Sequence, residues 1–297
     1  MPFSGVAMVR DEADVIEAFV RHNLRILDRL YVVDHRSRDG TREILGALIA
    51  EGLPVTFEAY DDESFRQPEI VTRLARRAFA NGATCVFALD ADEFLKIPSR
   101  VAFKRWIASV PPQFCGGLEW QTYVVDDQAA SSNPLVAARR RRAQEAHGLH
   151  KVILTGAFDR NPRAVVGPGN HLALMEGADQ DLKSHPAVLA VAPVALAALA
   201  HVPVRSSAQL VRKIRNGWRA HVAARRDDPT LATHWHDLYE EFERDGEPTG
   251  ARFRELSLNY GLSPPLWRPA ADIALVDDPL PATVPLRYRD LALPTLG

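Results

Sequence analysis

Apolar runs with the length of buried strands alternate with segments of helical periodicity over roughly the first ninety residues of this 297-residue chain. Strands are predicted at 5–9, 30–33, 54–59 and 84–89, with helices at 15–27, 41–50 and 69–80. This alternation is typical of a mostly parallel sheet covered by helices on both faces. We therefore expect an α/β fold whose ligand crevice lies at the carboxyl ends of the strands.

Acidic residues follow every one of these predicted strands. They are Asp11 and Glu12 after the first, Asp34 after the second, Asp61 and Asp62 after the third, and Asp90 and Asp92 after the fourth. Turns favour Asp, and that preference would explain any one of these positions taken alone. Because parallel strands end at one edge of a sheet, four acidic strand ends in succession favour a shared site at that edge.

The fourth strand leads into the sharpest local motif, V-F-A-L-D-A-D-E-F over residues 86–94. Its two carboxylates stand one residue apart, directly after an apolar run that would hold their direction. Hard divalent cations prefer oxygen ligands, and Mg²⁺ commonly takes one or two carboxylates together with phosphate oxygens. An Asp-x-Asp triplet is common by chance, but this one ends the fourth strand of an alternating pattern. We expect Asp90 and Asp92 to hold Mn²⁺ or Mg²⁺ beside a diphosphate leaving group.

After residue 100 the alternation weakens. A helix is predicted at 101–110, strands at 117–125, 152–154 and 172–174, and a basic amphipathic helix at 207–226. The basic run 139–142 is interpreted as a solvated face, with contact to a diphosphate or an anionic acceptor as the alternative. We place one domain over 1–205 and a helical, proline-rich C-terminal extension over 206–297.

Composition narrows the class of protein. The chain is 46% apolar and 25% charged, as in ordinary globular proteins, and its formal net charge of −2 argues against a nucleic-acid partner. Cys85 and Cys115 match no metal or redox spacing. No signal peptide is predicted, and the longest apolar stretch, 187–200, is short and contains Pro193. A cytoplasmic protein is expected, with membrane contact at most peripheral, at the inner membrane face.

Three segments carry a family resemblance. They read A-M-V-R-D-E-A-D-V-I-E-A-F-V-R-H-N-L from residue 7, Y-V-V-D-H-R-S-R-D-G-T-R-E-I-L from residue 31 and F-A-L-D-A-D-E-F-L from residue 87. The chain resembles the family-2-like glycosyltransferases of the GT-A fold, in the branch with an Asp-x-Asp-Glu-Phe metal motif. The likeness covers about residues 4–100 and continues weakly through 169–171 and 201–206 to Lys213. Asp11 replaces an expected Asn, and Arg38 replaces a small polar residue, which leaves the donor base and sugar open.

The resemblance implies a metal-dependent enzyme that moves a sugar from a nucleotide-diphosphate donor to the hydroxyl of a carbohydrate or glycolipid acceptor, with inversion. A UDP-sugar is the expected donor. The implied contacts are Glu12 with the nucleoside, Asp34 with ribose or base, Asp61 with the base edge, Asp90 with metal and ribose, and Lys151 and Arg205 with the diphosphate. Turn or capping roles remain open for the first three, and solvated surface positions remain open for Lys151 and Arg205. Gly40 is expected to supply a backbone conformation that other residues avoid.

Two further roles stay open between candidates. Enzymes of this fold often use a late histidine as an additional metal ligand, and we expect His171, in the turn P-G-N-H, with His201 as its competitor. An inverting transfer needs a base to take the proton of the acceptor hydroxyl. Glu119 and Asp126 are the candidates, since both lie in the stretch after the metal motif.

Three other classes compete with this interpretation. A nucleotidyltransferase usually has a glycine-rich loop after the first strand, and M-V-R-D-E-A at 8–13 contains no glycine. A phosphatase of the Asp-x-Asp type carries its nucleophile near the first strand, whereas this motif follows the fourth. A non-catalytic nucleotide- or sugar-binding protein of the same fold is disfavoured by the intact acidic pair, and metal-dependent donor hydrolysis would distinguish it from an enzyme.

Overall fold

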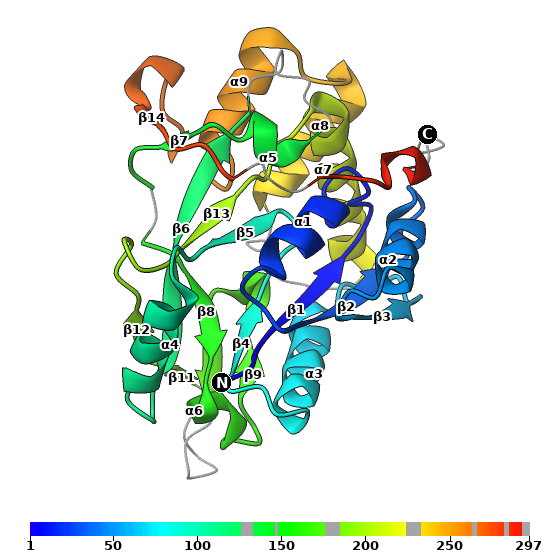
Figure 1. The fold of residues 1–297 in the computed structure, drawn as a ribbon. Coiled ribbons are helices and arrows are strands. Elements are labelled where there is room, and N and C mark those ends of the chain that lie inside the picture. The colour runs from blue at the N-terminus through cyan, green and yellow to red at the C-terminus, as the bar shows by residue number, and fades with distance from the viewer. Residues whose placement is uncertain are drawn as a thin grey trace.

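The computed structural model describes residues 1–125, 133–145, 148–175, 185–223, 233–262, 266–281 and 285–292. Its first part consists of β1 (Phe3–Val9), α1 (Ile16–Asn23), β2 (Arg29–His35), α2 (Thr41–Ala50), β3 (Val55–Tyr60), α3 (Gln67–Ala80), β4 (Cys85–Ala88), β5 (Glu93–Lys96) and α4 (Arg100–Ser109) (Figure 1). Strands and helices alternate as the sequence predicts. The short strand β5, directly after the acidic motif, is an addition to the predicted elements.

The second part is less regular. It consists of β6 (Cys115–Val124), α5 (Pro134–Ala137), β7 (Arg140–Arg142), β8 (His150–Leu154), α6 (Gly156–Asp159), β9 (Val165–Val166), η1 (Pro168–Asn170), β10 (Ala173–Met175), β11 (His185–Pro186), β12 (Leu189–Val191), β13 (Ala198–His201), α7 (Ser207–Ala223), α8 (Thr233–Asp245), α9 (Gly250–Asn259), η3 (Ala270–Asp272), β14 (Leu275–Asp277) and η4 (Arg289–Leu291). The basic run 139–142 therefore belongs largely to a strand, β7.

The central sheet has the order β14-β7-β6-β8-β4-β1-β2-β3. Strands β1 to β4 run parallel to one another, whereas β8 runs antiparallel to both β4 and β6. Strands β12 and β13 add to β6 in parallel, and β5 pairs antiparallel with β13. The expected α/β fold, a large and mostly parallel central sheet flanked by helices, is confirmed.

Alternate side chains of β1 enter two separate cores. Phe3 and Ala7 join a cluster with residues of α1, α2 and α4, whereas Val6 and Met8 join one with residues of α3 and α6. This division follows from the two-residue period of a strand, which points successive side chains to opposite faces. In the first cluster the rings of Phe3 and Phe103 meet edge to face, with centroids 5.6 Å apart, a contact worth about 0.5–1.5 kcal/mol beyond burial. The sheet is thus anchored on both faces, which holds its strand ends in place.

Gly40 begins α2 with φ of 93°, a left-handed conformation that disfavours any residue with a Cβ atom. A Cβ atom placed there would also lie 2.1 Å from the carbonyl oxygen of Leu291. The backbone role expected for Gly40 is confirmed. The close approach also shows that the C-terminal segment packs against the start of α2.

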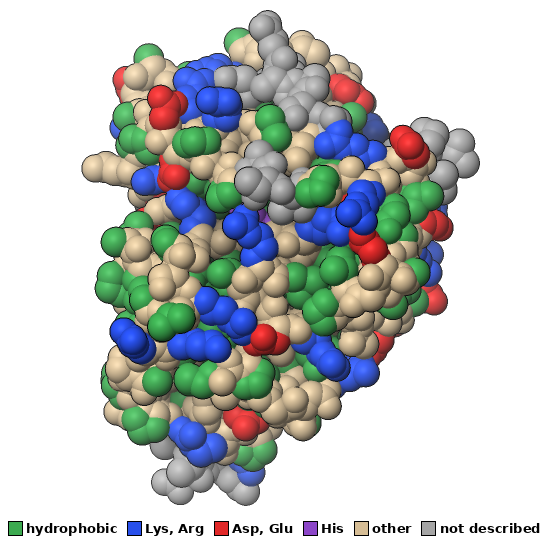
Figure 2. All heavy atoms as spheres, viewed as in Figure 1, with side chains coloured by type: hydrophobic (Ala, Val, Ile, Leu, Met, Phe, Trp, Pro, Cys, Tyr) green, Lys and Arg blue, Asp and Glu red, His purple; other side chains and the backbone are tan. Residues whose placement is uncertain are grey.

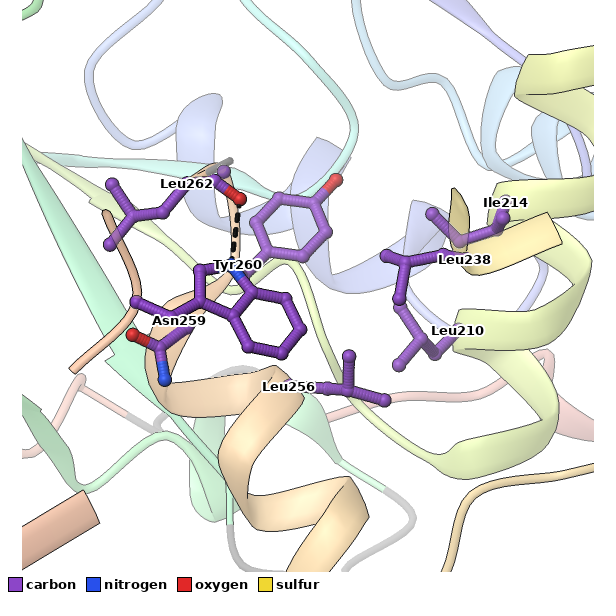
Figure 3. A pocket seen from close by; sticks show the side chains of 9 residues that line it. Leu210, Ile214, Leu238, Leu256, Asn259, Tyr260 and Leu262 are labelled. Atoms are coloured by element: carbon purple, nitrogen blue, oxygen red, sulfur yellow. Dashed lines mark hydrogen bonds between the residues drawn. The ribbon is translucent and has the colours of Figure 1, made fainter. Parts of the chain in front are cut away.

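Helices α7, α8 and α9 enclose a small core of their own, in which Leu210, Ile214, Phe242, Phe253 and Leu256 are buried. A pocket lined by apolar side chains lies between them, with Tyr260 and Leu262 on its wall (Figure 3). In the part of the chain that the structure describes, no helix combines the length and apolarity needed to cross a membrane. The division into 1–205 and 206–297 stays a prediction.

Candidate functional site

Four parallel strands bring the predicted acidic residues to one edge of the sheet. Val9 pairs with Asp34, and His35 pairs with Tyr60, so β1, β2 and β3 end side by side. Strand β4 joins β1 through the pair of Val6 and Ala88, and the turn 89–92 follows it directly. The expectation that Glu12, Asp34, Asp61, Asp90 and Asp92 share one edge therefore agrees with the register.

Asp90 is held in a fixed orientation by three side chains. Its Oδ1 accepts hydrogen bonds from Gln67 Nε2 and Asn170 Nδ2, both at 3.0 Å, and its Oδ2 lies 2.6 Å from Lys151 Nζ. The turn itself is closed by the Asp90 backbone N–H, which donates to Glu93 Oε2 at 2.9 Å. Asn170 comes from the turn P-G-N-H, so this turn serves the acidic motif through its amide.

Lys151 lies beneath this turn, and its side chain is 1% exposed. Its ammonium contacts Asp90, the fully buried Glu93 at 2.8 Å, and the carbonyl oxygen of Gly169 at 2.9 Å. Burial lowers the pKa of Lys151, but the carboxylates of Asp90 and Glu93 outweigh it and raise the pKa to about 12. With three acceptors in place, this ammonium holds the motif, and its expected contact with a diphosphate stays a prediction.

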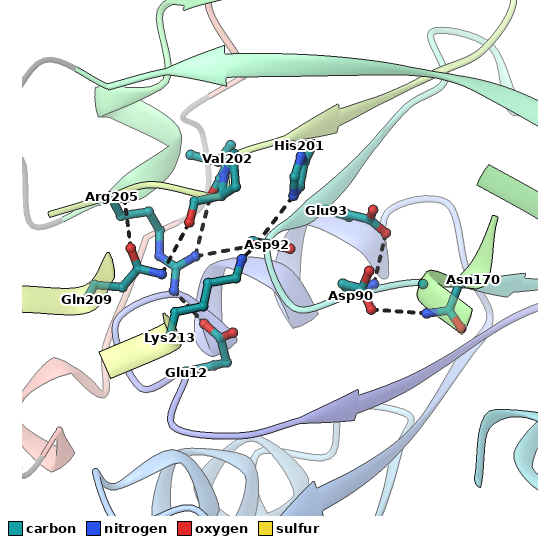
Figure 4. A network of polar contacts seen from close by, with 12 residues as sticks. Glu12, Asp90, Asp92, Glu93, Asn170, His201, Val202, Arg205, Gln209 and Lys213 are labelled. Carbon is teal, nitrogen blue, oxygen red and sulfur yellow. Dashed lines mark hydrogen bonds and ion pairs between the residues drawn. The ribbon is translucent and has the colours of Figure 1, made fainter. Parts of the chain in front are cut away.

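Asp92 is 3% exposed and faces three basic groups (Figure 4). Its Oδ2 lies 2.5 Å from Lys213 Nζ, 3.6 Å from His201 Nε2 and 3.9 Å from Arg205 Nη1. Burial raises the pKa of Asp92, yet Lys213, His201 and Arg205 together hold it well below its ordinary value. Asp92 is therefore an ionised carboxylate in a nearly dry position.

Arg205 connects the C-terminal half to the loop after β1. Its side chain pairs with Glu12 and, through Nε, with Asp14 Oδ2 at 2.6 Å. Burial raises the pKa of Glu12 to about 7, although Arg205 acts in the opposite direction. Nearby, Asn216 of α7 donates to Asp11 Oδ2 at 2.6 Å. The segment 201–216 therefore forms one wall of the site.

Asp34 and Asp61 share a single arginine, which the sequence did not single out. Arg42, on the first turn of α2, donates to Asp34 through Nε and to Asp61 Oδ1 at 3.0 Å. Asp34 is fully buried, and no hydrogen-bond partner of its Oδ2 is found among the described residues. Asp61 has an exposed side chain. Asp34 therefore presents one oriented, unused acceptor oxygen at the end of β2.

Two histidines flank Trp120 of β6. The Trp120 ring centroid lies 4.3 Å from that of His201 and 4.8 Å from that of His171. His171 Nδ1 lies 3.2 Å from the carbonyl oxygen of His150, which can only accept, so Nδ1 carries the proton and Nε2 keeps its lone pair. A backbone anchor of this kind is typical of metal-binding histidines. As the additional metal ligand, His201 is favoured by its short distance to Asp92, whereas His171 is favoured by the hydrogen bond that leaves its Nε2 free.

One of the two candidate bases, Glu119, is not brought to the acidic turn. Trp120 and Lys151 lie on the site face of the sheet, and side chains alternate along β6, so Glu119 points to the opposite face. There, Glu119 Oε1 accepts a hydrogen bond from Gln121 at 3.1 Å. Asp126 lies outside the described residues. Both assignments stay predictions.

A pH titration would test the environment of His171. Burial first, and then the Lys151 ammonium, lower the pKa of His171 from 6.5 to about 4. Below pH 6.5 the unfolded chain therefore binds a proton that the folded chain does not, so the free energy of unfolding falls as the pH drops from about 6.5 to 4. The full difference of about 2.5 pKa units corresponds to roughly 3 kcal/mol.

His171→Gln is expected to reduce the slope of this fall by about one proton, as measured by urea unfolding across that pH range. His185→Gln, at an exposed position in β11, is the matched control and should leave the slope unchanged. An equal slope in wild type and His171→Gln would contradict the assignment of a neutral, buried imidazole.

The chain was compared with known proteins at three levels. No protein-family model matches it, and no curated protein matches it. Solved structures do match. A mannosyltransferase from Pyrobaculum calidifontis, PcManGT, in complex with GDP-Man and Mn²⁺, is 16% identical, with 80% of this chain and 68% of that chain covered and a TM-score of 0.39.

Two other neighbours have lower identity. HddC from Yersinia pseudotuberculosis is 10% identical over 73% of this chain and 97% of its own, with a TM-score of 0.33. The 4-diphosphocytidyl-2C-methyl-D-erythritol synthase of Anaerococcus prevotii is 10% identical over 83% of this chain and 84% of its own, with a TM-score of 0.29. These likenesses are too weak to assign an activity, so any assignment rests on the residues of the chain itself.

Proposed function

We propose that this protein is a metal-dependent glycosyltransferase that moves a sugar from a nucleotide-diphosphate donor to an acceptor hydroxyl, with inversion. The observation that carries the proposal is the position of Asp92. Its ionised carboxylate is nearly buried at the carboxyl end of β4 and faces His201 at 3.6 Å, beside the ends of β1 and β2. In open parallel sheets this edge is where nucleotides bind.

The end of β2 supports binding of the nucleoside. Asp34 Oδ1 is held by Arg42 and by the backbone N–H of Ser37 at 3.1 Å, which fixes the direction of the free Oδ2. A buried acceptor without a partner is costly, and a ribose hydroxyl or a base N–H would satisfy it. On the face shown in Figure 2, Lys and Arg side chains are spread among apolar and some acidic side chains.

The acidic turn offers few protein ligands for a divalent cation. Among the described residues, no group of three or more His, Cys, Asp or Glu side chains is arranged to hold a metal. Asp92 and His201 nevertheless face each other, and carboxylate and imidazole both suit Mn²⁺. These two residues would hold the cation, with diphosphate oxygens and water as further ligands. When bound, the cation would neutralise negative charge on the diphosphate leaving group.

The protein's own residues would position the donor around this centre. Lys151 and Asn170 orient Asp90, whose side chain is 32% exposed and can therefore contact a ligand. Arg205 holds the loop that carries Glu12, and the ring of Trp120 packs against both histidines. This arrangement supports binding of a nucleotide sugar at the edge of the sheet.

A non-catalytic nucleotide-binding protein is the second candidate. The observation in its favour is that each motif carboxylate already has an ammonium partner, Lys151 for Asp90 and Lys213 for Asp92. Such pairs neutralise the acidic turn without a metal. Product formation decides between the two candidates, since a binder would leave its ligand intact.

The deciding experiment incubates the protein with UDP-, GDP-, CDP- and dTDP-sugars, with and without Mn²⁺, and resolves the products by chromatography. We expect one donor to release its nucleoside diphosphate and free sugar only when Mn²⁺ is present. Formation of pyrophosphate from a nucleoside triphosphate and a sugar 1-phosphate would identify a nucleotidyltransferase instead. Binding without any product would favour the non-catalytic candidate, and NMR of the anomeric product would test inversion.

A further inference from the structure

The ammonium of Lys213 occupies a position that a metal ion would also seek. Lys213 Nζ lies 2.5 Å from Asp92 Oδ2, on the same oxygen that faces His201 Nε2. Lys213 belongs to α7, and 121 residues separate it from Asp92 along the chain. A divalent cation on this oxygen would meet the positive charge of Lys213 at close range, so the two cations compete for one carboxylate.

The two lysines of the site are held very differently. Lys151 is 1% exposed and has three oxygen acceptors around its ammonium. Lys213 is 23% exposed, and among the described residues its ammonium contacts one carboxylate, that of Asp92, together with the side chain of Tyr260. Losing Lys151 from its place would strand two carboxylates, whereas Lys213 can turn towards solvent on its flexible stem. Lys213 is therefore the exchangeable partner.

The helix that carries Lys213 is fixed, so exchange requires movement of the side chain alone. Leu210 and Ile214 of α7 are buried in the core shared with α8 and α9. The ring of Tyr260 lies on the wall of the adjacent pocket (Figure 3), and its centroid is 5.0 Å from Lys213 Nζ. This ring gives the ammonium an aromatic surface to rest on as it leaves Asp92.

We propose that Lys213 acts as a resident counter-ion of Asp92 that is displaced by the divalent cation and then binds the diphosphate of the donor. This inference rests on the proposed function and adds a donor-binding residue to it. Cation and diphosphate bind next to each other, so an ammonium displaced from Asp92 finds phosphate oxygens within reach. The Lys213 ammonium would thus pair with Asp92 in the empty site and with the diphosphate in the loaded site.

The test measures two affinities in Lys213→Met, which keeps the apolar stem and removes the charge. Binding of Mn²⁺ alone, followed by the electron paramagnetic resonance signal of free Mn²⁺, is expected to become about tenfold tighter because the competing ammonium is gone. Binding of UDP and of GDP at saturating Mn²⁺, measured by calorimetry, is expected to become about tenfold weaker for the diphosphate that binds the wild type, because a charge-assisted contact is lost.

Two control variants separate this exchange from general electrostatics. Lys213→Arg keeps the charge and should retain most of the diphosphate affinity. Arg215→Met removes a charge from the same helix at an exposed pair with Glu243, and should change neither affinity by more than about twofold. Thermal unfolding of each variant checks that the fold is intact.

The outcomes separate the two claims. Opposite shifts of the two affinities in Lys213→Met support the exchange. If the wild type binds Mn²⁺ and a nucleoside diphosphate while either affinity is unchanged in Lys213→Met, the exchange is overturned and the proposed function stands. If neither the wild type nor Lys213→Met binds Mn²⁺, both claims fall.

Discussion

Asp92→Asn is expected to abolish the stabilisation that a nucleoside diphosphate with Mn²⁺ gives the wild type. A ligand that binds only the folded state, at about 100 times its dissociation constant, adds roughly 2.7 kcal/mol. In a chain of this size that gain raises the melting temperature by about 5–10 °C. The amide of Asn cannot supply the charge that holds a divalent cation next to His201, so we expect no metal-dependent shift.

The fold should survive this substitution, because the basic partners of Asp92 can form other ion pairs or be hydrated. Arg205 keeps its pairs with Glu12 and Asp14, and the partly exposed Lys213 can turn to water. Asp237→Asn, exposed on α8, is the control and should keep the full metal-dependent shift. If Asp92→Asn retains that shift as well, Asp92 does not hold the cation and the central proposal loses its main support.

Lys151→Met is expected to cost about 3–5 kcal/mol of unfolding free energy above about pH 8, where Glu93 is ionised, as measured by urea denaturation. Removing one partner of a buried ion pair leaves an uncompensated charge in a dry environment. Here the charges left behind are the carboxylates of Glu93, which is fully buried, and Asp90. Arg105→Met, at an exposed position on α4, should change stability by no more than about 0.5 kcal/mol.

A second substitution shows whether the unpaired Glu93 carboxylate causes the loss of unfolding free energy in Lys151→Met. Lys151→Met with Glu93→Gln removes one stranded charge and should recover part of the stability. Burial raises the pKa of Glu93 to about 8, so the cost of Lys151→Met alone should shrink as the pH falls below about 8 and Glu93 takes up a proton. A cost that is equal across pH, with no recovery in the double variant, would show that Lys151 contributes through packing alone.

Local patterns in the sequence were sufficient for the N-terminal elements. The helix predicted at 41–50 has the same bounds in the structure, because Gly40 in a left-handed conformation marks its start. Strands β1 to β4 appear within about two residues of their predicted positions, since each is a short apolar run between turn residues. Their order along the chain then places the acidic residues on one edge.

Strand β5 shows where local patterns stop being informative. Its four residues, E-F-L-K, have no distinctive period, and they become a strand by pairing with β13, about 100 residues further along the chain. The basic run at β7 reads as a solvated face, but it pairs with β6 and with the C-terminal strand β14. Long-range pairing of this kind depends on the rest of the sheet.

The sequence by itself determined the α/β alternation, the acidic edge and the pair Asp90 and Asp92, because each depends on residue types at short spacing. Only the tertiary structure decided what surrounds that pair. Lys151, Asn170, His201 and Lys213 reach it from separate segments, and Glu119 falls on the far face of β6. These contacts span about 60 to 120 residues and arise only when the sheet and α7 have packed, so no local pattern encodes them.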